Sequence, residues 1–118
     1  MRVFVYRNLH KNCLSVKDVK TGRVIEHVDN IVLKNVKFKV SEKGRERVLR
    51  EKCKNVHAGV EGEWMKDENP PELNDCVRVV YDPYKFSSFV KNDTLEPQKS
   101  CNYAVVTIRG VFIYDKTA

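Results

Sequence analysis

The sequence predicts a small α+β protein, built from a mostly antiparallel β-sheet with one short basic helix packed on it. Short runs of β-forming residues alternate with polar residues and are separated by turn-forming residues, which is typical of antiparallel strands. One interior segment, residues 42–53, follows a serine that can cap a helix and carries cations at helical spacing. The length of 118 residues fits one domain, taken as residues 1–118.

Most of the chain is assigned to predicted strands. KTGR, with Thr21–Gly22, suits a tight hairpin turn, and Arg109–Gly110 suits another near the end of the chain. The predicted strands cover residues 2–7, 14–19, 23–28, 31–40, 55–62, 76–81, 102–108 and 111–114.

The strand at 31–40 has a clear period of two. Val36, Phe38 and Val40 alternate with Lys37 and Lys39. This alternation predicts a half-buried strand with a basic outer face. Lys37 and Lys39 are therefore expected to point away from the core.

The predicted helix covers residues 42–53. Ser41 can cap its N-terminus, and Glu42 lies in the first turn, where the helix dipole favours a carboxylate. Val48 and Leu49 would face the sheet. The opposite side would carry a stripe of cations, roughly 60° wide at 100° per residue, formed by Lys43, Arg47, Arg50 and Lys54.

Three segments lack a regular period. Residues 66–75 (KDENPPELND) predict an acidic loop with two prolines, and residues 91–100 predict a second loop. Residues 82–90 (DPYKFSSFV) begin with an Asp-Pro turn and continue into an aromatic-rich piece that the pattern does not assign.

The net charge of +6 is concentrated in one part of the chain. Residues 34–54 contain nine basic and three acidic residues, whereas the remainder contains 13 of each. The segment 61–75 is acidic, so the chain is polarised, and such a charge distribution orients association with a charged partner. No apolar run is long enough for a signal-peptide core or a membrane span, which favours an intracellular protein.

This charge distribution predicts a binding surface for an acidic partner. Several cations along one ridge are the arrangement that phosphate binding requires, because their contacts release counterions. The alternative is an ordinary solvated face, partly neutralised by the pair Glu46 and Arg50. The predicted binding residues are Lys37, Lys39, Lys43, Arg47, Arg50 and Lys54.

The aromatic residues late in the chain offer a second, weaker possibility. They could stack on the bases of single-stranded nucleic acid. Most are expected to lie in the core instead, and no RNP motif, zinc finger, KH loop or helix-turn-helix pattern accompanies them. The residues concerned are Tyr81, Tyr84, Phe86 and Phe89.

Cysteine and histidine spacing raises the possibility of zinc. His10-x2-Cys13 and Cys53-x3-His57 have compatible spacings if the two pairs meet in space. Neither pair matches a zinc finger or ribbon, and no CxxC occurs, so we predict free thiols, no metal and no cofactor.

A catalytic role for His57 is a further alternative. A general base would need a partner, and Lys54, Glu61 and His10 are candidates by sequence alone. The chain contains no glycine-rich phosphate loop, nucleophile elbow or paired-acid metal motif. We therefore predict that the protein is not an enzyme.

Several segments resemble a group of small phage proteins. They are VYRNL (5–9), SV (15–16), GRVIEH (22–27), GRERVLREKCKNVHAGVEG (44–62) and YDPYKFSSFV (81–90), and the similarity covers most of residues 3–90. The basic helix followed by KNVHA is the most specific piece, although Cys53 stands where the group leads us to expect another basic residue. The resemblance implies a viral or prophage origin and action in the cytoplasm of the bacterial host. It carries over no activity, cofactor or catalytic residue.

Two functions are consistent with these observations. The first is a non-enzymatic phage accessory protein that binds and inhibits a host defence nucleoprotein or enzyme, as anti-CRISPR proteins do, with the basic face docked on an acidic protein surface or on bound nucleic acid. The second is a direct DNA- or RNA-binding module in phage replication or regulation. Both use the same cations, and neither involves a membrane. Oligomeric state does not follow from the sequence.

Overall fold

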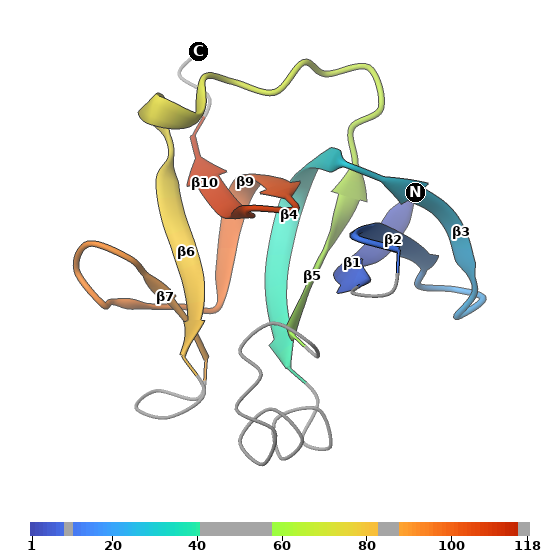
Figure 1. The fold of residues 1–118 in the computed structure, drawn as a ribbon, viewed down its shortest axis with the longest axis horizontal. Coiled ribbons are helices and arrows are strands. Elements are labelled where there is room, and N and C mark those ends of the chain that lie inside the picture. The colour runs from blue at the N-terminus through green and yellow to red at the C-terminus, as the bar shows by residue number, and fades with distance from the viewer. Residues whose placement is uncertain (9–10, 41–57, 83–87, 116–118) are drawn as a thin grey trace.

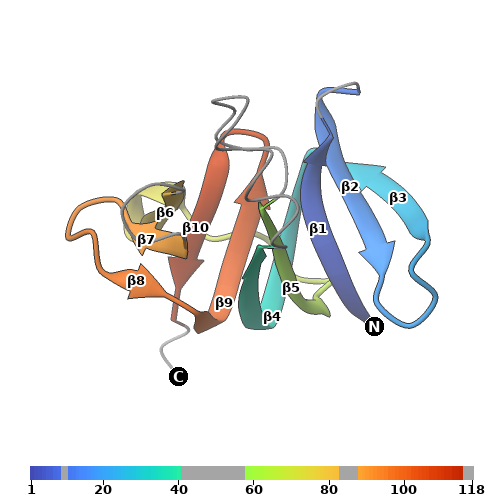
Figure 2. The same cartoon turned by 90° about the horizontal axis from the view of Figure 1, so that it is seen from below.

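The protein is one highly curled antiparallel sheet in a computed structural model that describes residues 1–8, 11–40, 58–82 and 88–115 (Figures 1 and 2). The sheet order is β3-β2-β1-β5-β4-β9-β10-β6-β7-β8, and every neighbouring pair is antiparallel. The strands are β1 (Arg2–Asn8), β2 (Cys13–Asp18), β3 (Val24–Val28), β4 (Asn30–Val40), β5 (Ala58–Trp64), β6 (Val77–Asp82), β7 (Ser88–Lys91), β8 (Pro97–Gln98), β9 (Ser100–Thr107) and β10 (Gly110–Tyr114).

The predicted α+β class is wrong, because the described residues are almost entirely strand. Their one helical element is a 3-10 turn, η1, at Leu73–Asp75. The predicted helix at 42–53 lies outside the described residues. The mostly antiparallel sheet is confirmed, and its described strands bury their apolar face by curling onto one another. No helix in the described ranges is long and apolar enough to cross a membrane.

The predicted strands agree closely with the observed ones, and the differences lie at short or irregular elements. The predicted strand at 55–62 corresponds over residues 58–62 to β5, which continues to Trp64, and residues 55–57 lie outside the described residues. The unassigned segment 82–90 contains the start of β7, and the predicted loop at 91–100 contains the two-residue β8. The hairpin turn at Thr21–Gly22 is confirmed: the Gly22 amide donates to the carbonyl oxygen of Asp18 at 2.8 Å.

The core lies on one face of the sheet, called here the inner face. Because the sheet curls, strands that are not hydrogen-bonded neighbours meet across it: the rings of Phe38 on β4 and Phe89 on β7 are 4.9 Å apart. Alternate residues along each strand supply this face. The buried cluster comprises Val3, Val5, Leu14, Val16, Ile31, Leu33, Val36, Val60, Val79, Tyr81, Phe89, Ala104, Val106 and Ile113.

Two of the aromatic residues considered for base stacking belong to this core. Tyr81 is 7% exposed and Phe89 is 5% exposed, and their rings are 5.6 Å apart. Neither ring can offer a free face to a nucleic-acid base, so the stacking platform is wrong for this pair and the core interpretation is confirmed. Tyr84 and Phe86 lie outside the described residues.

Candidate functional site

The outer face of β4 carries three lysines, called here the lysine face: Lys34, Lys37 and Lys39. Leu33, Val36 and Phe38 face the opposite way, toward the core, as the alternation predicts. Lys37 and Lys39 are exposed, in agreement with the predicted basic outer face. The four other predicted binding residues, Lys43, Arg47, Arg50 and Lys54, lie outside the described residues.

A β-bulge puts Lys34 on the same face as the other two lysines. Lys34 and Lys37 are three residues apart and would face opposite sides of a regular strand. The pairing with β5 shifts between them, so that Lys34 lies opposite Glu63 and Lys37 opposite Glu61. One extra residue is thereby accommodated in β4, as in other bulges. The sequence alternation did not reveal this, so Lys34 was missed as a site residue.

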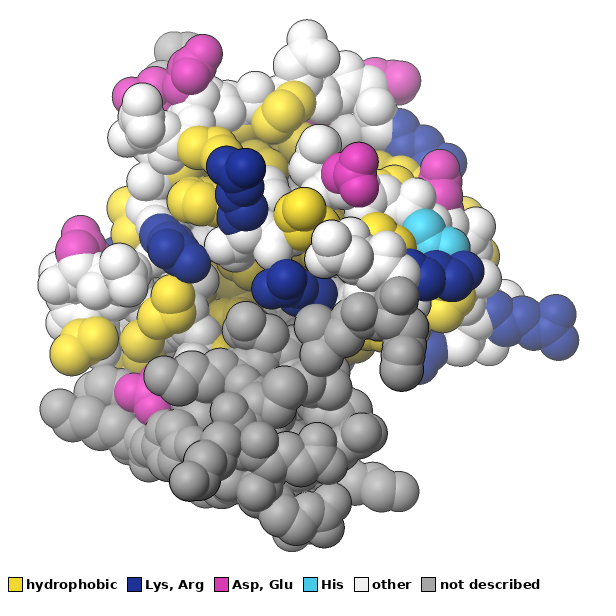
Figure 3. Space-filling view, viewed as in Figure 1, with side chains coloured by type: hydrophobic (Ala, Val, Ile, Leu, Met, Phe, Trp, Pro, Cys, Tyr) yellow, Lys and Arg dark blue, Asp and Glu magenta, His cyan; other side chains and the backbone are white. Residues whose placement is uncertain are grey.

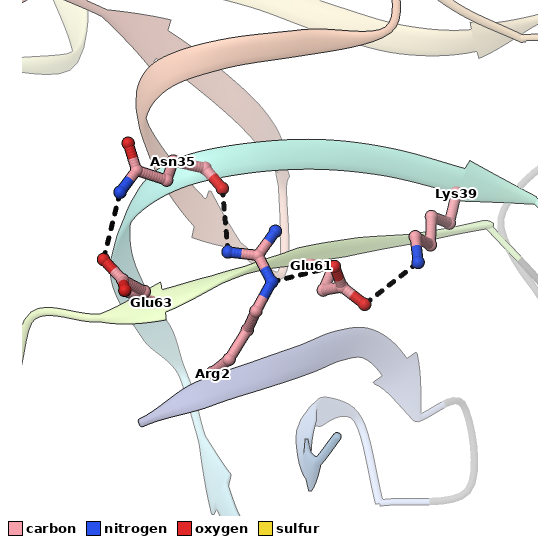
Figure 4. Close-up of polar contacts among 5 residues, drawn as sticks. All are labelled: Arg2, Asn35, Lys39, Glu61 and Glu63. Carbon is pink, nitrogen blue, oxygen red and sulfur yellow. Dashed lines mark hydrogen bonds and ion pairs between the residues drawn. The ribbon is translucent and has the colours of Figure 1, made fainter. Parts of the chain in front are cut away.

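Asn35 forms the bulge with its backbone in the left-handed region, at φ 51°. Asparagine tolerates this conformation better than most residues because its short amide can bond locally. Its Nδ2 donates to Glu63 at 3.1 Å, and its carbonyl oxygen accepts from Arg2 Nη1 at 3.1 Å (Figure 4). The bulge is therefore fixed by contacts from β5, its neighbour, and from β1, the strand beyond β5.

Across from the bulge, β5 carries a glycine that the close approach of β4 requires. A Cβ on Gly62 would lie 3.0 Å from Leu33 Cβ and 3.0 Å from the carbonyl oxygen of Lys34. Both atoms belong to or adjoin the backbone of β4, so neither can move aside easily. Gly62 thus allows β4 and β5 to stay close where the register shifts.

A buried carboxylate, Glu61, joins β1, β4 and β5. It accepts from Arg2 Nε at 2.9 Å and from Lys39 Nζ at 3.0 Å (Figure 4). The residue is only 8% exposed. Burial alone would raise the pKa of Glu61, but the hydrogen bonds and positive charges of Lys39 and Arg2 outweigh it, so the pKa lies below its ordinary value of 4.5.

These ion pairs divide the lysine face into free and engaged cations. Lys39 is bound to Glu61, and Lys34 lies 3.8 Å from Glu63, a weak pair between exposed groups. Lys37 makes no ion pair within the described part of the chain. Lys37 is therefore the cation most available to a partner, and Lys34 is the next.

The alternative sites involving histidine and cysteine receive no support from the described geometry. Glu61, considered as a partner for His57, is instead engaged by Arg2 and Lys39. His10, Cys53 and His57 lie outside the described residues, so the zinc and general-base alternatives are not tested. Cys13, Cys76 and Cys101 are free thiols. Burial, and then the charge of Asp115, raise the pKa of Cys101 to about 12, which makes it a poor nucleophile.

Comparison with known proteins bears out the phage resemblance. A family model described as Mycobacterium phage L5 gene 82 protein matches residues 1–114. The gene 82 protein of Mycobacterium phage L5 is 33% identical over 120 residues, which cover 94% of each chain. No solved structure matches. The basic-helix and KNVHA marker remains a sequence prediction, but the chain belongs to the Mycobacterium phage L5 gene 82 protein family.

Proposed function

We propose that this phage protein is a non-enzymatic accessory protein that binds and inhibits a host defence nucleoprotein or enzyme in the bacterial cytoplasm. The observation that carries the proposal is the lysine face: a bulge aligns Lys34 with Lys37 and Lys39 on the exposed outer face of β4. In the sequence this strand leads directly into the segment that holds the excess positive charge. An acidic partner surface complements such a face.

The carboxylates on the same face favour a protein partner over a bare phosphate backbone. Glu61 and Glu63 on β5 lie directly opposite Lys37 and Lys34 on β4. A row of phosphates would meet these negative charges as well as the lysines, whereas a protein surface can present both signs in a matching pattern. Direct binding of DNA or RNA is therefore the alternative, and the experiment separates it from protein binding.

The experiment is an affinity capture from host lysate, with and without nuclease, followed by titration of the purified target. The variant Lys34→Glu/Lys37→Glu should lose at least about tenfold in affinity, equivalent to about 1.4 kcal/mol. The matched control is Lys20→Glu/Arg23→Glu, which makes the same charge change at exposed positions in the β2–β3 turn. This control should bind the target as the wild type does.

Two results would contradict the proposal. Equal binding by the lysine-face variant and the control would remove the lysine face from the interaction. Capture that disappears with nuclease, together with an affinity that falls steeply with salt at a slope of about 0.9 per phosphate contact, would establish the nucleic-acid alternative.

A further inference from the structure

The curled sheet forms a partly open cavity of about 660 Å³ on its inner face. It lies between two groups of strands that are distant in sheet order, β1–β2–β5 on one side and β6–β7–β9–β10 on the other. Its volume falls within the range of small-molecule sites, about 300–1,000 Å³. Its accessible apolar wall includes Val80, Leu95, Ile108 and Val111, and the core residues Val5, Leu14 and Val60 lie behind it.

One wall of this cavity carries an arginine. Arg7 follows Val3 and Val5 along β1 at a spacing of two and pairs with Leu14 on β2. Strand geometry therefore puts its side chain on the inner face with these core residues. Its Nε is buried and has no hydrogen-bond partner within the described residues. A buried guanidinium donor that lacks an acceptor is what an anionic ligand would satisfy.

Two further arginines border the cavity near the β9–β10 turn. Arg78 on β6 donates through Nη2 to the carbonyl oxygen of Arg109, at 3.2 Å. Among the described lining residues, Asp82 is the one carboxylate against three arginines. Figure 3 shows basic side chains among hydrophobic ones over the middle of the face seen in Figure 1. The described lining of the cavity thus carries a positive net charge.

We propose that this cavity binds a small organic anion that has an apolar or aromatic body, with its anionic group on Arg7. An inorganic anion would lose its hydration against the apolar wall, and its contact with the Arg7 guanidinium alone would have to compensate for that loss. A ligand with an apolar body also buries its own surface against the partly exposed apolar residues of the lining, Val80, Ile108 and Val111. This site is on the opposite face of the sheet from the lysine face, so it does not depend on the function proposed above.

The test uses two fluorescent probes that differ chiefly in charge. One is 8-anilinonaphthalene-1-sulfonate, and the other is N-phenyl-1-naphthylamine, which has the same ring system without the sulfonate. The wild type should bind one equivalent of the sulfonate, and this binding should raise the melting temperature. Such a rise distinguishes binding to the folded protein from binding to a partly unfolded state. Arg7→Met should weaken binding of the sulfonate by about tenfold and leave binding of the neutral probe within about twofold.

The matched control is Arg23→Met, which makes the same replacement at an exposed turn. It should bind both probes as the wild type does. Equal binding of the sulfonate by Arg7→Met and the wild type would overturn the proposal, as would an equal loss for both probes.

A second measurement does not depend on the folding of any variant. In NMR spectra of the wild-type protein, the sulfonate probe should shift the methyl signals of Val5, Leu14 and Val60. Shifts confined to Val24 and Ile25, which are exposed on the edge strand β3, would assign the probe to that surface and overturn the cavity site.

Discussion

The two arginines of β1 have the same side chain and opposite surroundings. Arg2 is on the outer face, where its Nε donates to Glu61 and its Nη1 to the carbonyl oxygen of Asn35. Arg7 is on the inner face, where its Nε is buried without a partner among the described residues. An odd spacing along a strand puts the two on opposite sides. The outer arginine therefore stabilises the fold, whereas the inner one costs stability until an anion binds it.

The sharpest test of this difference replaces each arginine by methionine, which keeps an apolar stem of similar length. Arg2→Met should lower the free energy of unfolding by about 2 kcal/mol, because it removes charge-assisted hydrogen bonds from a buried carboxylate. Arg7→Met should leave it unchanged or raise it by up to about 1 kcal/mol, because an unsatisfied donor disappears. Urea denaturation at pH 7 measures both. Equal losses in the two variants would contradict the comparison.

The next largest effect concerns the carboxylate that Arg2 engages. Glu61→Gln should cost about 1–2 kcal/mol at pH 7, because glutamine keeps the size of the side chain but loses its charge. The pKa of Glu61 is lowered in the folded state, so its contribution is present above the ordinary value of 4.5 and is lost as pH falls through the folded-state pKa. The stabilities of variant and wild type should therefore converge in acid.

The control for this pH dependence is Glu26→Gln, at an exposed position on the edge strand β3. It should stay within about 0.5 kcal/mol of the wild type at both pH values. A Glu61→Gln deficit that is as large at pH 3 as at pH 7 would show that packing, rather than charge, accounts for the loss.

The third effect is on the bulge that holds Arg2 and the lysine face in place. Asn35→Ala should cost about 1 kcal/mol, since alanine is disfavoured at φ 51°. Asn35→Gly should cost less, because glycine adopts this conformation freely and only the exposed bond to Glu63 is lost. Thermal unfolding of the two variants gives the comparison. A glycine variant less stable than the alanine variant would mean that the amide bond matters more than the backbone.

The alternation along β4 was sufficient to predict its basic outer face, because a period of two depends only on local strand geometry. It failed at Asn35, because a bulge depends on how β4 and β5 pair. The partnership of Arg2 with Glu61 was equally hidden: the two residues are 59 positions apart and meet only through the sheet order. Local patterns therefore predicted strands and faces, but not which charges neutralise one another.

The fold class failed for a related reason. The sequence predicted a helix at 42–53, packed on the sheet, from a capping serine and cations at helical spacing. The described strands instead bury their apolar face by curling, as the Phe38–Phe89 contact shows. Curling also creates the cavity beside Arg7, so neither the cavity nor the environment of Arg7 could be predicted from strand patterns alone.

The smallest expected effect separates the two cations that share Glu61. Lys39 Nζ lies 3.0 Å from the carboxylate, nearly as close as Arg2, but the Lys39 side chain is 54% exposed against 32% for Arg2. Water and salt screen an exposed pair, so Lys39→Met should cost no more than about 0.5 kcal/mol, and this loss should vanish in about 1 M salt. The Arg2→Met loss should largely persist there, because Arg2 also bonds the backbone at Asn35. Equal salt sensitivity of the two variants would mean that screening affects both pairs alike, and that burial and the backbone bond at Asn35 do not distinguish Arg2 from Lys39.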